Sequence, residues 1–278
     1  MPEEELKYHE QVPCWPEFKI QGDAIDGWIP SCRLNDLEHF MKWIREADHK
    51  GLVYRGQRRY DWNLFSSLSR RYKDKLVPRH DRAELFEQFR LAMRSRGPQF
   101  KLPDKNEIWA YGQHNGLHTP LLDWSKSPFI SLYFAFVESD DSREKKPNTS
   151  RAMFCLNRSL LAKEGLLRHN IFYEPASDEH IRLVSQAGLF TISPSGRDDL
   201  ALYIIKELES HKDVDLGVPD DNEAFLLSKY LHKIHIPNIG REEYLDVLKK
   251  MNIHHGSLFP DAFGAAQFAN EWLRQRII

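Results

Sequence analysis

The chain has few of the features that define several large classes of protein. Its 278 residues include three cysteines, which are too far apart to form a metal or disulfide spacing. The longest apolar run, residues 129–137, is interrupted by Ser131 and is far shorter than the ~20 residues that span a bilayer. The first residues lack the basic and then apolar order of a secretion signal. These absences favour a cytoplasmic protein that uses no metal and contacts no membrane.

An excess of charge of one sign is also lacking. Lysine and arginine number 39 and aspartate and glutamate 41, so the formal net charge is −2. This balance excludes electrostatic binding of nucleic acid over the whole surface of the protein. A local basic patch is still possible. The sequence contains no phosphate-binding P-loop, no dinucleotide-binding glycine motif and no G-x-S-x-G elbow. Hydrophobic residues, at 41%, suffice for a packed core.

Hydrophobic periodicity predicts a mixture of helices and strands without regular alternation, which favours an α+β fold. We expect residues 1–30 to be irregular and to wrap the domain or fray, and residues 31–278 to form a single domain with an exposed charged loop at 139–149. Helices are predicted from residue 35 to before Gly51 and at residues 82–96, 106–114, 129–138, 242–251 and 261–275. Strands are predicted at residues 52–54, 118–124, 152–156, 189–192 and 231–236. Residues 200–208 fit either structure, Asn35 is the expected cap of the first helix, and Ser127 with Pro128 forms a strong helix start.

The first cluster of candidate functional residues is Tyr54-Arg55-Gly56-Gln57. Arg55 stands at the end of an apolar strand and is followed by glycine, which lets the backbone approach a ligand closely. A guanidinium in this place suits the bidentate capture of a phosphate. The alternative is an arginine that only anchors a turn through carbonyl groups.

The second cluster spans residues 111–128, where a predicted strand leads into the buried helix. It contains His114, His118, Asp123, Ser125 and Ser127. Polar groups at a strand end and a helix start can hold an anion or a sugar hydroxyl. The alternative is a turn-rich connection in which Asp123 and Ser127 cap backbone groups.

The third cluster spans residues 182–191 and centres on Gln186. Its amide can both donate and accept hydrogen bonds, as a ribose requires. On spacing alone, a helix-to-strand turn with Gly188 as its hinge and Gln186 holding a backbone group explains the segment better than a ligand site does.

Together these clusters resemble the FRG domain family, which is named for an aromatic-Arg-Gly motif. The matching segments are residues 54–57, 113–116, 121–128, 132–135, 182–191 and 257–264. They keep the family's order and cover the chain from about residue 25 to its end, and the Gln-His-x-Gly and Leu-Leu-Asp-Trp blocks are the specific ones. Where the family usually reads Pro-Thr-Arg, this chain has His118-Thr119-Pro120, so a basic side chain is absent at Pro120. The resemblance implies an effector of the toxin or phage-defence type, with a neutralising antitoxin as one partner.

A weaker similarity to ADP-ribosyltransferases implies a fold and a reaction. Tyr54-Arg55-Gly56 is similar to their first strand, and residues 123–127 leading into a helix are similar to their second element. Their third element is a glutamate, for which Gln186, Glu174 or Glu179 could stand here. The resemblance implies a split, mixed or antiparallel sheet with flanking helices. The implied substrate is NAD, with ADP-ribose passing to a protein or nucleic acid acceptor or to water.

The chemistry of this reaction suits the residue types present. Cleavage of the nicotinamide–ribose bond passes through an oxocarbenium-like centre, as glycoside hydrolysis does. The similarity therefore implies Arg55 on the pyrophosphate, Tyr54 or Trp124 beside the nicotinamide, and Asp123 or Glu174 as the negative charge. The implied catalytic residues are Arg55, Asp123, Ser125 and Gln186, and the implied NAD-binding residues are Tyr54, Arg55, Gly56, Gln57, His114, Trp124 and Ser125.

Two other functions remain open on the sequence. A non-catalytic module could bind a ligand or single-stranded nucleic acid through a basic strip interleaved with aromatic residues at 58–73. The arginines of this strip are Arg58, Arg59, Arg70 and Arg71. A purely structural or adaptor domain explains the fold but leaves the histidines and the Asp123-Trp124 pair without a purpose.

Overall fold

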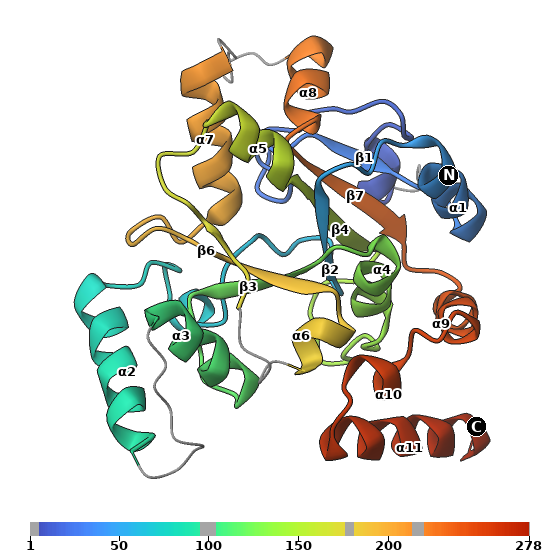
Figure 1. Cartoon of the computed structure of the whole chain (residues 1–278). Coiled ribbons are helices and arrows are strands. Elements are labelled where there is room, and N and C mark those ends of the chain that lie inside the picture. The colour runs from blue at the N-terminus through green and yellow to red at the C-terminus, as the bar shows by residue number, and fades with distance from the viewer. Residues whose placement is uncertain (1–5, 95–103, 176–180, 213–219, 278) are drawn as a thin grey trace.

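The computed structural model describes residues 6–94, 104–175, 181–212 and 220–277, and its centre is a seven-stranded sheet (Figure 1). The strand order is β1-β7-β4-β2-β3-β6-β5. Strands β1 and β7 run parallel, and every other neighbouring pair runs antiparallel. The predicted α+β class is therefore confirmed, with a mixed sheet. The strands are β1 Ser31–Arg33, β2 Leu52–Gln57, β3 Leu121–Ser125, β4 Ser150–Asn157, β5 Phe172–Tyr173, β6 Gly188–Ile192 and β7 Leu231–Pro237.

Helices flank the sheet, and each of those predicted from the sequence is present. The α-helices of the structure, predicted or not, are α1 Leu37–Glu46, α2 Arg79–Ala92, α3 Lys105–His114, α4 Pro128–Phe136, α5 Arg158–Glu164, α6 Ile181–Ser185, α7 Leu200–Lys212, α8 Asp221–Ser228, α9 Arg241–Lys250, α10 His255–Leu258 and α11 Ala262–Ile277. The predicted cap of α1 is wrong, because the side chain of Asp36 rather than Asn35 accepts the hydrogen bond from the His39 amide. In the described ranges, no helix combines the length and apolar character that crossing a membrane requires.

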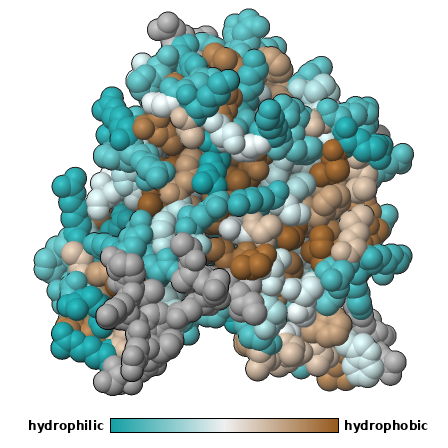
Figure 2. All heavy atoms as spheres, viewed as in Figure 1, coloured by the Kyte–Doolittle hydropathy of each residue, from teal (hydrophilic) through white to brown (hydrophobic). Residues whose placement is uncertain are grey.

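The side chains of the central strands point alternately into two hydrophobic layers, one on each face of the sheet. Val53 and Phe154 belong to the layer that includes α5, α7 and α8, whereas Tyr54 and Cys155 belong to the layer that includes α1, α4 and α9. A smaller cluster joins β3 and β6 to α2 and α3. Helices must cover both faces, since side chains of a strand point alternately to opposite faces and both sets here are apolar. Figure 2 shows hydrophilic residues over much of one outer surface and hydrophobic residues gathered mainly in its middle and right.

The packing of β2 against α4 explains the glycine of the Tyr-Arg-Gly motif. Ser127 accepts a hydrogen bond from the Ile130 amide and Pro128 occupies the first turn, so the predicted helix start is confirmed. A Cβ atom on Gly56 would lie 1.9 Å from the carbonyl oxygen of Ser131. Only glycine allows this approach, and it brings the backbone of β2 directly beneath α4.

The sheet opens between β2 and β3. These strands share a single residue pair, Tyr54 with Ser125, whereas β2 pairs with β4 along all its residues from Leu52 to Gln57. Strand β3 is likewise paired along its length with β6. Beyond Tyr54 the strands therefore separate, and a gap opens beside Arg55 in the middle of the sheet.

The segment before residue 31 packs on the domain and carries a buried charge. Asp26 lies against β7, where its carboxylate is 2.7 Å from the Lys233 ammonium and 2.9 Å from His235 Nε2. All three side chains are fully buried. Although burial favours a neutral carboxyl, Lys233 and His235 outweigh it and hold the pKa of Asp26 well below its usual value.

Acid is expected to destabilise the protein through His232, a second buried histidine of β7. Its Nδ1 donates to the Ser228 carbonyl, and burial lowers its pKa from 6.5 to about 4. In the unfolded chain, His232 takes up a proton near pH 6.5, whereas in the folded chain it does so only near pH 4. The free energy of unfolding therefore decreases as the pH falls from about 6.5 to about 4. The expected loss is about 3 kcal/mol. Urea unfolding at several pH values measures this loss. If the free energy of unfolding of His232→Gln depended on pH in this range as strongly as that of the parent, the prediction would be contradicted.

Candidate functional site

A cleft of about 330 Å³ lies where β2 and β3 separate. Strand β2 supplies Arg55 at this point, β3 supplies Asp123, and α4 borders the cleft on one side. The lining residues are Tyr54, Arg55, Gly56, Gln57, Arg58, Trp62, Arg70, Asp123, Trp124, Ser125, Ser131, Phe134, Glu138, Gln186 and Phe259. The structure thus brings the first, second and third sequence clusters to one place, although they are distant along the chain.

Arg55 bridges the gap between the two strands. Its Nη1 donates to the Asp123 carbonyl at 2.6 Å and lies 3.7 Å from Asp123 Oδ2. The guanidinium is 15% exposed and the Asp123 side chain 57%, so the arginine forms the floor and the carboxylate faces the opening. Burial lowers the pKa of Arg55, and the negative charge of Asp123 opposes this shift.

The residues of the Gln-His block hold the Asp123 carboxylate in place. Gln113 Nε2, at the end of α3, donates to Asp123 Oδ1 at 2.7 Å. The other end of this amide accepts a hydrogen bond from the Thr119 hydroxyl, which orients the amide. Asp123 therefore has one oxygen near a guanidinium and one on an amide, which fixes its rotamer.

Several polar atoms around the cleft are buried and have no hydrogen-bond partner. They are Nε of Arg55, Oε1 of Gln57, Nε and Nη1 of Arg58, and Oγ of Ser131. Buried polar groups are nearly always paired in folded proteins, since an unpaired one costs about 1–3 kcal/mol. A concentration of unpaired donors and acceptors around one cavity indicates a site built for a polar ligand.

Tyr54 and Trp124, the two aromatic residues expected beside a nicotinamide, have their rings buried in the core. The Tyr54 ring is 1% exposed, packs edge-on against Trp43 and shares a 2.7 Å hydrogen bond with His49. The Trp124 indole is 3% exposed and donates to Thr191 on β6. The two rings are buried in opposite hydrophobic layers, although both residues also line the cleft, and their role beside a nicotinamide stays a prediction.

Other rings, which the sequence analysis did not assign to the cleft, face it as well. Trp62 is 39% exposed and packs against the Arg58 guanidinium. Phe134 of α4 and Phe259 after α10 meet edge to face, with 6.1 Å between ring centres. Phe134 and Phe259 fall within segments that match the FRG pattern, and that position was the only sequence signal for them.

Ser125 and Gln186 lie in the cleft wall, where their side chains already make hydrogen bonds. Ser125 Oγ donates to the Gln186 carbonyl at 2.8 Å and accepts from the Ser127 amide at 3.0 Å. Gln186 Nε2 donates to the Leu258 carbonyl at 3.1 Å. The two residues thus fasten β3, α6 and α10 together, and the catalytic role implied by the resemblance stays a prediction.

Two further candidate residues lie away from the cleft. His114 is absent from its lining and lies near Asp261, whose pKa is lowered chiefly by a hydrogen bond from Arg182 and also by His114. Glu174 forms ion pairs with Arg158 and Lys126 and is absent from the lining of the cleft. Glu179 lies outside the described residues. In the described part of the chain, no group of His, Cys, Asp and Glu could hold a metal ion.

The basic strip at residues 58–73 does not form one continuous surface. Arg58 and Arg59 are both paired with Glu144, which ties the largely exposed 139–149 loop to the segment that follows β2. Their side chains are 10% and 7% exposed. Arg70 lines the cleft, with its Nη1 on the Phe65 carbonyl, and Arg71 is exposed outside it.

This architecture defines an α+β protein whose polar cleft lies in the opening of a mixed sheet. The FRG domain family model matches residues 50–144, and the chain therefore contains an FRG domain. The matched segment includes β2, Gln113 and Asp123, whereas Gln186 and Phe259 close the cleft from beyond it. No curated protein and no solved structure matches the chain.

Proposed function

We propose that the cleft binds NAD and cleaves its nicotinamide–ribose bond, passing ADP-ribose to a macromolecule or to water. The observation that carries this proposal is the Arg55–Asp123 pair at the opening between β2 and β3. A buried guanidinium on the floor and an exposed carboxylate at the mouth supply the two charges that the reaction needs. The single residue pair between β2 and β3 also favours an ADP-ribosyltransferase-like split sheet.

The arginines of the cleft suit the pyrophosphate. Arg55 has a buried Nε without a hydrogen-bond partner, and Arg70 lines the same cavity. Charge-assisted hydrogen bonds from guanidinium groups to phosphate oxygens are among the strongest in proteins. A bound pyrophosphate would supply a partner for the unpaired Nε of Arg55 and offset its positive charge.

The remaining lining residues suit the sugar and ring portions of NAD. Gln57 and Ser131 present a buried acceptor and a buried hydroxyl, both unpaired, which ribose hydroxyls or a carboxamide could satisfy. The half-exposed ring of Trp62, with Phe134 and Phe259, offers aromatic faces on which the nicotinamide or adenine ring can stack.

The proposed reaction proceeds by loss of nicotinamide. The bond between ribose C1′ and the ring nitrogen breaks, its electron pair leaves with neutral nicotinamide, and positive charge develops on the sugar. The Asp123 carboxylate stabilises that charge and accepts the proton of the attacking hydroxyl or water as the new C1′ bond forms. Gln113 and Arg55 keep the carboxylate aimed at the opening throughout.

An effector of the toxin or phage-defence type would act in this way, and a neutralising partner could cover the same cleft. The alternative of a nucleic-acid module receives less support, because Glu144 neutralises both Arg58 and Arg59. An arginine that is already paired with a carboxylate releases no counterions from a phosphate backbone.

Replacing Arg55 by alanine tests the proposal. We expect the variant to bind NAD about 10–100-fold more weakly, because a buried charge-assisted hydrogen bond is lost. Nicotinamide release is measured chromatographically, for the protein alone and then with DNA, RNA or cell extract. Arg55→Lys should retain part of the affinity, and Arg71→Ala, outside the cleft, should retain all of it. Equal NAD affinity in Arg55→Ala, or no release from folded protein under any condition, would refute the proposal.

A further inference from the structure

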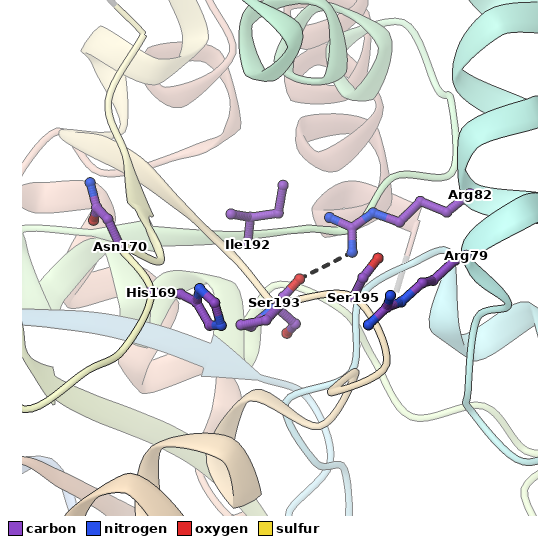
Figure 3. Close-up of a pocket in the computed structure, with 8 residues that line it drawn as sticks. Arg79, Arg82, His169, Asn170, Ile192, Ser193 and Ser195 are labelled. Atoms are coloured by element: carbon purple, nitrogen blue, oxygen red, sulfur yellow. Dashed lines mark hydrogen bonds between the residues drawn. The ribbon is translucent and has the colours of Figure 1, made fainter.

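A second cavity, of about 310 Å³, lies between the start of α2 and the end of β6 (Figure 3). Its polar lining residues are Arg79, Arg82, His169, Asn170, Ser193 and Ser195. None of them lines the cleft described above. In Figure 3, Ser195 lies between the side chains of Arg79 and Arg82, and His169 with Asn170 borders the opposite side. We propose that this cavity is a separate binding site for a terminal phosphate group.

The positive charge of the cavity lacks a partner. Arg79 and Arg82 stand in the first turn of α2, where the unpaired backbone N–H groups already make a positive end. Two cations are unfavourable there unless an anion is bound. Within the described ranges, no carboxylate lies at ion-pair distance from either arginine, and Arg82 donates only to the Ser193 carbonyl, at 3.1 Å.

The nearby acidic residues make their hydrogen bonds elsewhere, although the negative charge of Asp198 opposes the lowering of the Arg82 pKa by burial. Asp81, in the same helical turn, accepts a hydrogen bond from the Tyr72 hydroxyl and lies 3.5 Å from His80 Nδ1. Asp198 is buried and accepts hydrogen bonds from the Val77 amide and the Ser69 hydroxyl. Neither carboxylate lines the cavity, so an anion would meet no negative charge in its wall.

Ser193 provides a second and independent indication of a ligand. The residue is 3% exposed and lines the cavity, yet its hydroxyl has no hydrogen-bond partner. A buried hydroxyl without a partner is destabilising, so such groups are rare in folded proteins. A phosphate oxygen in the cavity would accept this hydrogen bond and, at the same time, those of the arginines.

The combination of donors favours phosphate over a carboxylate. Two guanidinium groups, two hydroxyls and the amides of the helix start surround one space, and a tetrahedral phosphate offers oxygens in several directions at once. The volume is near the lower limit for ligand pockets, so it suits a phosphate with a small attached group. Inorganic phosphate and the end of a phosphate monoester share this chemistry.

Thermal unfolding and calorimetric titration test the site. Sodium phosphate and ribose 5-phosphate are each compared with sodium chloride at equal ionic strength. We expect at least one phosphate compound to raise the unfolding temperature and to bind at one site. Binding of phosphate alone would identify the free ion as the ligand, and binding of both compounds would identify the terminal phosphate group.

Two variants are matched to the site without threatening the fold. Arg79→Gln changes an exposed side chain, and Ser193→Ala removes only the unpaired hydroxyl. We expect phosphate affinity to fall at least about tenfold in Arg79→Gln and about three- to tenfold in Ser193→Ala, and to stay unchanged in Arg55→Ala. Equal effects of phosphate and chloride, or a loss confined to Arg55→Ala, would overturn the proposal, the latter placing phosphate in the cleft.

Discussion

Asp123→Asn is expected to slow nicotinamide release by about 10²–10³-fold while weakening NAD binding far less. The substitution keeps the size of the side chain and an oxygen that accepts from Gln113, but it removes the negative charge that the developing oxocarbenium centre requires. Loss of one preorganised electrostatic group in other enzymes has an effect of this size. Steady-state rates at saturating NAD, together with a direct measurement of NAD affinity, separate the two effects.

Two carboxylates serve as controls for this substitution. Glu174→Gln removes a charge that is paired with Lys126 and Arg158 outside the cleft, and should leave release unchanged. Glu138→Gln removes the other carboxylate that lines the cleft, which lies 3.6 Å from Arg58 Nε. A normal rate in Asp123→Asn together with a large loss in Glu138→Gln would assign the negative charge to Glu138 instead.

Asp26→Ala is expected to lower the free energy of unfolding by about 3–5 kcal/mol. The substitution leaves the ammonium of Lys233 buried at 0% exposure without its carboxylate, and it also deprives His235 of its partner. An uncompensated buried charge is far more costly than a broken surface pair. Urea unfolding at neutral pH measures the change, provided that the variant is compared with the parent at equal concentration.

The matched control is a surface ion pair on α9. Glu242→Ala breaks the pair between Arg241 and a carboxylate whose side chain is 76% exposed, and should cost less than about 1 kcal/mol. Lys233→Met added to Asp26→Ala should recover part of the loss, because it removes the stranded charge. A loss below 1 kcal/mol in Asp26→Ala would show that the Lys233 ammonium reaches other partners.

Local signals in the sequence were reliable where a helix start or a strand alternation stood alone. Ser127 and Pro128 predicted the start of α4 correctly, because capping is a contact between residues three positions apart. Residues 200–208 were ambiguous for the opposite reason. Leu200, Ala201 and the buried run 203–205 are apolar on several sides of α7, so the pattern has no clear period.

The candidate site was found from residue types and order, but its internal arrangement was not. Arg55, Asp123 and Gln186 do meet at one cleft, as the three clusters suggested. The directions of Tyr54 and Trp124 depend on which face of the sheet each strand presents, and that choice follows from the helices packed on it. Without those contacts, a strand of alternating residues gives no indication of which set faces a ligand.

By itself, the sequence determined the α+β class, the helices and strands with strong local signals, and the residues from which a polar site is built. Only the tertiary structure decided the strand order, the opening between β2 and β3, and the pairing of Arg58 with Glu144. It also placed Asp26 of the irregular N-terminal segment against Lys233 in the core. The reason is physical: caps and periodicity act over a few neighbouring residues, whereas strand partners and buried charges are selected by packing between segments far apart in the chain.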